Sequence, residues 1–210
     1  MVIIMAYDLI AITGRSGSGK SAVSRYYTAL GQTVLDADAI SREVLYADED
    51  VRRALLLHFG TGILADDEAQ PAMARIAPKR LAAAAFENAQ SANALTQITH
   101  PAIVKRILAL AQEENKPLVF VDGAVIIGAM LERYCKRFIV ITAPQEDMIK
   151  RIVSRDAITR ESAMRRLSVQ LSQEEMCARA DFIIENFQDE AQLLQNAQAV
   201  LRTLLKEYHV

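Results

Sequence analysis

The chain has 210 residues, which suffices for one domain or for one domain with a modest insertion. Hydrophobic residues make up 51% of the chain, enough for a sizeable core, and the formal net charge is −2. The chain therefore lacks the basic excess that marks binding to nucleic acid or to acidic membranes, and we expect neither partner.

The chain begins with an apolar stretch that leads directly into a glycine-rich loop. Residues 1–10 carry no basic segment and no small-residue cleavage motif, so we interpret them as a strand and not as a signal peptide. Short apolar runs predict five strands, at Asp8–Thr13, Thr33–Leu35, Pro117–Val121, Phe138–Thr142 and Phe182–Ile184. Helical spacing predicts helices at Lys20–Leu30, Ala39–Phe59, Pro101–Glu114 and Asp189–Leu205.

The predicted strands are nearly continuous in Val, Ile, Leu and Phe and do not alternate with polar residues. Buried parallel strands have this composition because helices cover both faces of the sheet. We therefore predict an α/β fold with a five-stranded parallel sheet in a single domain, residues 1–210. Two segments depart from this rhythm: about residues 60–116, predicted to be a helical insertion, and about residues 150–179, where arginines cluster.

Two further features bear on the compartment. Cys135 and Cys177 have neither metal-site spacing nor a CxxC motif, so we expect reduced thiols in a cytoplasmic protein. The longest apolar run, from Pro117 to Leu131, is interrupted by Asp122 and is too short to span a bilayer.

A complete phosphate-binding loop lies between the first predicted strand and the first predicted helix. Residues 14–21, GRSGSGKS, match G-x-x-x-x-G-K-[ST], whose glycines let backbone N–H groups converge on a phosphate at a helix N-terminus. Lys20 is expected to reach the β- and γ-phosphates of ATP, and the Ser21 hydroxyl to coordinate Mg²⁺. The expected ATP-binding residues are Ser16, Gly17, Ser18, Gly19, Lys20, Ser21 and Ala22. A guanine-specific NKxD motif is absent, which favours a small-molecule kinase over a GTPase.

A pair of carboxylates, Asp36 and Asp38, follows the second predicted strand. Ligands of parallel sheets bind at the carboxyl ends of strands, and alternate residues of an extended chain point to one side. One carboxylate is predicted to accept a proton from a substrate hydroxyl and the other to hold water molecules of Mg²⁺. The alternative for Asp38 is a cap of the following helix. Arg42, one turn later, is either a ligand of a substrate phosphate or a surface residue.

Three other positions have both a functional and a structural interpretation. Asp122, at the end of the third strand, is a candidate ligand of Mg²⁺ or substrate, or a turn residue. His100 is a candidate substrate contact, or a structural residue before Pro101 at a helix start. The arginines between residues 151 and 166 form either a lid over the ATP phosphates or a solvated helix.

The ordered combination of these motifs resembles the dephospho-CoA kinase family over about residues 8–186. The loop is followed by DAD-x-x-x-R at residues 36–42, by Phe59-Gly60, by His100-Pro101 and by the late Ala180-Asp181 and Asn186. Between them, Lys150-Arg151, Arg155-Asp156, Thr159-Arg160 and Gln170 resemble the lid pattern of the family.

This resemblance implies a three-layer P-loop kinase fold with a helical substrate region and a lid. It implies that ATP phosphorylates the 3′-hydroxyl of dephospho-CoA, the last step of coenzyme A synthesis. By the same resemblance Asp38 is the general base, Lys20 the phosphate lysine and Arg151 the arginine on the transferring phosphoryl group. Asp38, Arg42, His100 and Asp122 bind substrate, and Arg155 and Arg160 belong to the lid. A monomer or weak oligomer is expected.

The chain departs from the family pattern at several positions. Arg15 and Ser16 replace a Gly-Ile pair in the loop, and Gly128 stands where an acid is usual after the third strand. Pro78 falls where an arginine is usual in the helical region. Because the latter two changes lie in regions expected to hold the acceptor, a P-loop kinase for another small molecule stays open as an alternative. A further alternative is an ATP-binding protein without turnover, against which the intact Lys20, Ser21, Asp38 and Arg151 argue.

Overall fold

The computed structural model describes residues 7–65 and 75–209. The chain divides into two compact units: one is formed by residues up to Asp36 together with those from Leu110 onward, and the other by Ala37–Ala109. Within the described ranges, no helix has the length and apolar character needed to cross a membrane.

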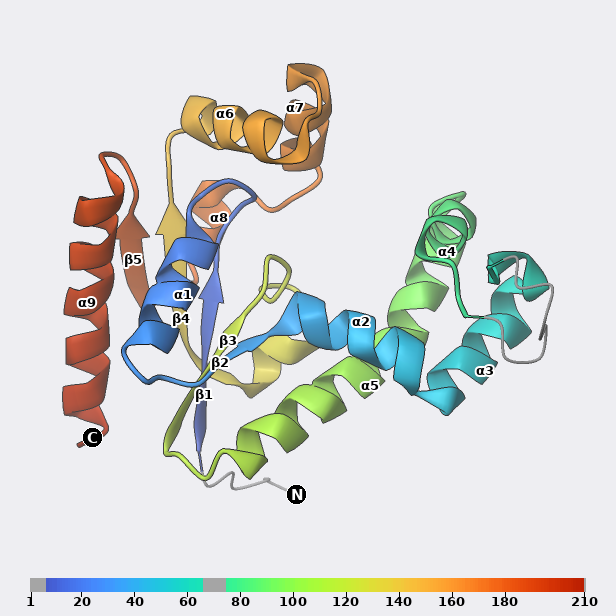
Figure 1. The fold of residues 1–210 in the computed structure, drawn as a ribbon, viewed down its shortest axis with the longest axis horizontal. Helices are drawn as coiled ribbons and strands as arrows, with labels where there is room; N and C mark the ends of the chain where they lie inside the picture. The colour runs from blue at the N-terminus through green and yellow to red at the C-terminus, as the bar shows by residue number, and fades with distance from the viewer. Residues whose placement is uncertain (1–6, 66–74, 210) are drawn as a thin grey trace. The chain divides into compact units, whose positions relative to one another are not determined.

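The first unit is built on a five-stranded parallel sheet with strand order β2-β3-β1-β4-β5 (Figure 1). Its strands are β1 (Asp8–Thr13), β2 (Val34–Asp36), β3 (Leu118–Asp122), β4 (Cys135–Thr142) and β5 (Phe182–Glu185). The predicted α/β fold with five parallel strands is therefore confirmed, with strand ends that differ from the prediction by up to three residues. All five residues of β3 are buried, as the continuous apolar run predicted.

Helices cover both faces of this sheet. On one face, α1 (Lys20–Ala29) and α9 (Glu190–Glu207) enclose a core that includes Tyr27 and Phe120. The Tyr27 hydroxyl donates to the Ala197 carbonyl at 2.8 Å, which joins the two helices. On the other face, Met176 of α8 (Gln173–Cys177) packs against Val140.

The segment after β4 forms a small helical layer with its own core. It contains α6 (Gln145–Asp156) and α7 (Arg160–Ser168), which lie beyond the carboxyl ends of the strands (Figure 1). Met148 and Ile152 of α6 pack with Leu167 of α7 in a buried cluster. Thr159 caps the start of α7, since its side chain accepts from the backbone N–H of Ser162. A 3₁₀ turn, η3 (Met130–Tyr134), precedes β4.

The second unit is helical. It contains α2 (Ala37–Ala47), α3 (Glu49–Phe59), the 3₁₀ turn η1 (Thr61–Ile63), α4 (Pro78–Ala85) and most of α5 (Ala89–Glu113). The prediction of one helix over Ala39–Phe59 is wrong, because Asp48 is extended and its side chain accepts from the N–H groups of Asp50 and Val51. An aspartate N-cap therefore ends one helix and starts the next.

The prediction that a helix begins at Pro101 is also wrong. Pro101 lies inside the 25-residue helix α5. Proline lacks a backbone N–H and normally interrupts a helix interior, so the sequence pattern placed it in the first turn. Residues on both sides of it in α5 are buried, including Thr99, Val104 and Ile107, and this packing maintains the helix through the proline. Of the predicted helical region, residues 66–74 lie outside the described part of the chain.

Candidate functional site

The phosphate-binding loop connects β1 to α1, as predicted. Its backbone has positive φ at Gly17 (80°) and Gly19 (105°), a conformation that residues with a Cβ rarely adopt. A Cβ on Gly17 would lie 2.5 Å from the carbonyl oxygen of Met148, and a Cβ on Gly19 would meet the side chain of Asn186. Gly19 is also the N-cap residue of α1, so the loop presents the positive end of that helix dipole.

Side chains from later in the chain hold this loop. The Asn186 side-chain amide is buried and donates to the Ser18 carbonyl at 2.7 Å. Arg151 of α6 donates to the carbonyls of Gly17 at 3.1 Å and Ser18 at 3.5 Å. The sequence identified Asn186 only as part of a family pattern. Its contact with the loop depends on the strand order, in which β4 lies beside β1 and β5 lies beside β4.

Lys20 forms an ion pair with Asp122, at the carboxyl end of β3. The two side chains are only 14% and 12% exposed. The strand order explains this contact: β3 is the neighbour of β1, and Asp122 lies opposite Ile12 in the register, near the start of the loop. The sequence placed Asp122 at a strand end but did not indicate that Lys20 is its partner.

Oxygen ligands gather around a cavity of about 390 Å³ beside the loop. The cavity is lined by Ser21, Ser24, Arg25, Thr28, Val34, Asp36 and Asp122. The two carboxylates come from neighbouring strands, since Asp36 lies directly opposite Asp122 in the pairing of β2 with β3. Hydroxyl and carboxylate oxygens are the donors that Mg²⁺ prefers, so this donor set fits a magnesium ion bound with water and phosphate. Among the described residues, no cluster of three or more His, Cys, Asp or Glu side chains offers a metal site made of protein groups alone.

The predicted lid arginines are paired on the surface of the α6–α7 layer. Arg155 pairs with Asp156, whose second oxygen also receives Arg166. Hydrogen bonds from Arg155 and Arg166 lower the pKa of Asp156 well below the usual range of a carboxyl group. Arg160 of α7 makes two bonds to Glu146 of α6, at 2.9 and 2.7 Å. Only Arg151 of the predicted arginine set contacts the phosphate loop here.

Asp38, Arg42 and His100 belong to the helical unit. Asp38 lies in the first turn of α2, which begins at Ala37, so it is neither the predicted N-cap nor part of an extended chain with Asp36. Asp38 and Arg42 are exposed and four residues apart on one helix, which places them on the same face. His100 is half-buried within α5, and this burial lowers the pKa of its imidazole.

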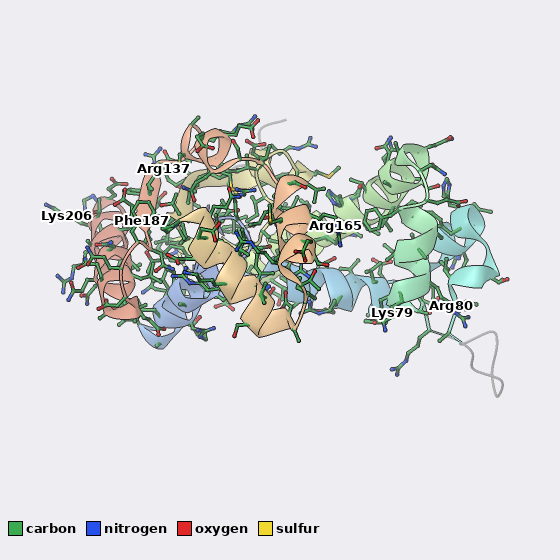
Figure 2. The ribbon with its side chains drawn as sticks, turned by 90° about the horizontal axis from the view of Figure 1, so that it is seen from above. Lys79, Arg80, Arg137, Arg165, Phe187 and Lys206 are labelled. Atoms are coloured by element: carbon green, nitrogen blue, oxygen red, sulfur yellow. The ribbon has the colours of Figure 1, made fainter. Side chains whose placement is uncertain are left out.

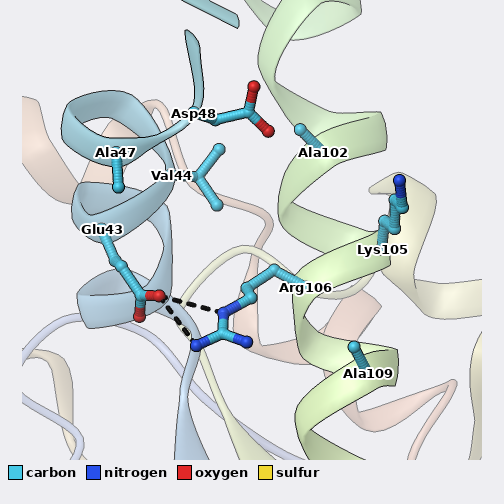
Figure 3. A pocket seen from close by; sticks show the side chains of 8 residues that line it. All are labelled: Glu43, Val44, Ala47, Asp48, Ala102, Lys105, Arg106 and Ala109. Carbon is cyan, nitrogen blue, oxygen red and sulfur yellow. Dashed lines mark hydrogen bonds and ion pairs between the residues drawn. The ribbon is translucent and has the colours of Figure 1, made fainter. Parts of the chain in front are cut away.

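The helical unit also contains a groove of about 270 Å³ between α2 and α5 (Figure 3). An ion pair crosses the groove, from Arg106 of α5 to Glu43 of α2, with its nitrogen–oxygen distances at 2.9 and 3.0 Å. The groove is lined by Glu43, Val44, Ala47, Asp48, Ala102, Lys105, Arg106 and Ala109. None of the predicted substrate residues lines it.

Two departures from the family pattern have a local structural reason. Pro78 occupies the start of α4, where its missing N–H costs no helical hydrogen bond. Gly128 has a φ of 82°, and its N–H donates to Glu132 at 2.8 Å. This bond, together with the Arg179 guanidinium, holds the pKa of Glu132 below its usual range.

A family model and several sequence relatives point to the same family. A model of the dephospho-CoA kinase family matches residues 8–192. The dephospho-CoA kinase of Geobacter metallireducens is 34% identical over 181 residues, which cover 85% of this chain and 87% of the relative. That of Idiomarina loihiensis is 31% identical over 178 residues, 85% of both chains.

Solved structures agree with the sequence relatives. A crystal structure from Thermus thermophilus is similar to this chain with a TM-score of 0.81 and 27% identity, covering 94% of this chain and 98% of the other. The dephospho-CoA kinase from Campylobacter jejuni has a TM-score of 0.61 and 27% identity, covering 94% and 97%. A shikimate kinase from Acinetobacter baumannii, at 18% identity and a TM-score of 0.53 over 96% and 94%, shares the fold.

Proposed function

The chain belongs to the dephospho-CoA kinase family, whose activity is the last step of coenzyme A synthesis, and we propose that Lys20, Asp38 and Arg151 carry out that reaction here. In it, the γ-phosphoryl group of ATP moves to the 3′-hydroxyl of dephospho-CoA, and ADP and coenzyme A leave. The family match over residues 8–192 is the observation that carries this proposal.

The proposed roles follow the requirements of phosphoryl transfer. The transferred group carries its charge on oxygens, so catalysis consists mainly of positioning and charge neutralisation. We assign Lys20 to the β- and γ-phosphates, the loop residues Ser16 to Ala22 to the rest of the triphosphate, and Arg151 to the charge of the transition state. Asp38 accepts the proton of the attacking hydroxyl.

Magnesium is the cofactor that we propose beside ATP. Ser21 would hold it through its hydroxyl, and the carboxylates of Asp36 and Asp122 lie on the same cavity and suit its hydration shell. The bound ion would neutralise phosphate charge during transfer. Asp122 pairs with Lys20 in this structure, and in the proposed ATP complex Lys20 would exchange this carboxylate for phosphate oxygens.

The acceptor and lid assignments complete the proposal. Asp38, Arg42 and His100 of the helical unit, together with Asp122, would bind dephospho-CoA, and the arginines Arg155 and Arg160 would belong to a lid over ATP. We propose a single P-loop kinase domain over residues 1–210, with a helical substrate region at about residues 60–116 and a lid at about residues 150–179. It would act in the cytoplasm as a monomer or weak oligomer, with no nucleic-acid or membrane partner.

The first experiment is ADP release from Mg·ATP with dephospho-CoA, compared with a panel of nucleosides, nucleoside monophosphates and sugars. Stimulation by dephospho-CoA alone supports the proposal. A response only to another acceptor would show that the acceptor site serves a different small molecule. ATP binding without ADP release for any acceptor would indicate a protein that binds ATP without turnover.

The role of Asp38 has a separate test. We expect Asp38→Asn to bind ATP as the wild type does and to lower kcat about 10²-fold or more, the scale of losing a general base. The neighbouring first-turn substitution Ala39→Ser is the control. An unchanged kcat would return Asp38 to a structural role in the first turn of α2.

A further inference from the structure

Three hydrogen bonds connect the phosphate loop to residues about 150 positions later in the chain, at the end of α7 and in the segment that follows it. Arg15 Nη2 donates to the Leu167 carbonyl at 2.6 Å. The Ser16 N–H donates to Gln170 Oε1 at 3.1 Å, and Gln170 Nε2 donates to the Ser16 hydroxyl at 3.0 Å. All four residues belong to the unit that contains the sheet.

The Leu167 carbonyl is a favourable acceptor for the Arg15 guanidinium. Leu167 is the next-to-last residue of α7, and the last carbonyls of a helix have no partner inside the helix. A cation at this end also interacts favourably with the helix dipole. The backbone N–H of Gln170 donates to the same carbonyl at 3.2 Å. Arg15 and Gln170 therefore both bond to the Leu167 carbonyl, and Gln170 also contacts Ser16.

These contacts restrain the outer side of the loop. The N–H of Ser18 donates to the Arg15 carbonyl at 3.0 Å, which closes a turn over residues 15–18. The N–H and hydroxyl of Ser16 are both taken by Gln170. The orientation of the following N–H groups, at the start of α1, depends on this turn, because they continue the same backbone.

We propose that Arg15 and Gln170 are positioning residues that fix the phosphate loop in its ATP-binding conformation by attaching it to the end of α7. A loop that already has its binding conformation before the ligand arrives loses less conformational freedom on binding, so the ligand binds more tightly. The proposal rests on ATP being the ligand of the loop, as proposed above. It predicts that both residues affect the affinity for ATP and leave that for dephospho-CoA unchanged.

The test uses the whole enzyme and measures Mg·ATP binding by calorimetry without acceptor, followed by KM for each substrate. Arg15→Met and Gln170→Leu are each expected to raise the Kd of Mg·ATP about tenfold, equivalent to about 1.4 kcal/mol. The KM for dephospho-CoA is expected to stay within about twofold, and Arg15→Lys to recover part of the ATP affinity because it restores a charged donor. Thermal unfolding of each variant is recorded to establish that it is folded at the assay temperature.

Arg137→Met is the matched control. Arg137, labelled in Figure 2, lies in β4, and its guanidinium pairs with Asp181 and not with the loop. This variant loses the same charge as Arg15→Met and is expected to bind ATP as the wild type does.

Three other results would overturn this proposal or the proposed function. Gln170→Leu changes no charge, so unchanged ATP affinity in this variant would overturn the proposal even if Arg15→Met binds weakly. Equal losses of ATP affinity in Arg137→Met and Arg15→Met would also overturn it, because the loss of charge alone would then account for the effect. Absence of ATP binding by the wild type would instead refute the proposed function.

Discussion

Substitution of Lys20 by methionine separates the structural from the catalytic contribution of this residue. Lys20 and Asp122 form an ion pair with side chains 14% and 12% exposed. Removing one partner of a buried pair costs about 3–5 kcal/mol, because the other charge stays desolvated. Asp122 lines an open cavity that admits water, so we expect a smaller loss, about 2 kcal/mol. In a chain of this length, that loss lowers Tm by about 4–8 °C.

The double variant Lys20→Met with Asp122→Asn tests the cause of this loss. Asparagine has no charge to leave unpaired, so we expect the double variant to regain most of the lost Tm. Its ADP release should remain as low as that of Lys20→Met, because methionine cannot bind the phosphates. Thermal unfolding followed by circular dichroism, at one pH and salt concentration, gives the stability of the wild type, both single variants and the double variant.

Two results would refute this reasoning. A Tm for Lys20→Met equal to that of the wild type would show that Asp122 tolerates the loss of its partner. A double variant no more stable than Lys20→Met would show that the loss comes from packing of the lysine stem. Near-normal ADP release by Lys20→Met would contradict the assignment of the phosphate loop itself.

The other predictions concern single side chains. Burial lowers the pKa of His100, so the unfolded chain binds a proton at this residue more readily than the folded chain does. The free energy of unfolding should therefore fall as the pH drops below about 6.5. Between pH 7.5 and 5, the Tm of His100→Gln should depend less on pH than the Tm of the wild type. Burial raises the pKa of Cys135 to about 12, so this thiol is not expected to react as a thiolate in the folded protein. In Cys177→Ser, where Cys135 is the remaining thiol, a disulfide reagent at pH 8 should react only after unfolding. Rapid reaction of the folded variant would contradict this. Pro101→Ala restores a backbone N–H donor inside α5. It should raise the free energy of unfolding by about 1 kcal/mol, which is part of what a proline costs in a helix interior. A Tm lower than that of the wild type would show that α5 requires the proline.

The sheet and the loop were predictable because their signals are local. β1 and β3 are continuous apolar runs, and the loop between Gly14 and Ser21 needs its residue types at fixed spacing. Each signal lies within a few residues, and the structure agrees with it to within a few positions.

The partners of the loop were not predictable from such signals. Lys20 and Asp122 are 102 residues apart, and Asn186 contacts a carbonyl 168 residues before it. These contacts depend on the order β2-β3-β1-β4-β5, and a chain of buried parallel strands carries no local mark of which strands are neighbours. The separation of α2 from α3 at Asp48 was not predicted either, although its signal is local. That signal is a single aspartate within a sequence that is helical on both sides.

Arg15 shows why a matched motif is an incomplete description of a phosphate loop. The motif specifies the glycines, the lysine and the hydroxyl, because these determine the backbone and the phosphate ligands. It leaves the positions of Arg15 and Ser16 open, and from sequence Arg15 is only a bulky departure from the family. In the structure its guanidinium donates to the Leu167 carbonyl at the end of α7, which also accepts from the backbone N–H groups of Val169 and Gln170. The variable positions of the loop are therefore where this chain attaches its phosphate site to the rest of the fold, and only the fold identifies the attachment point.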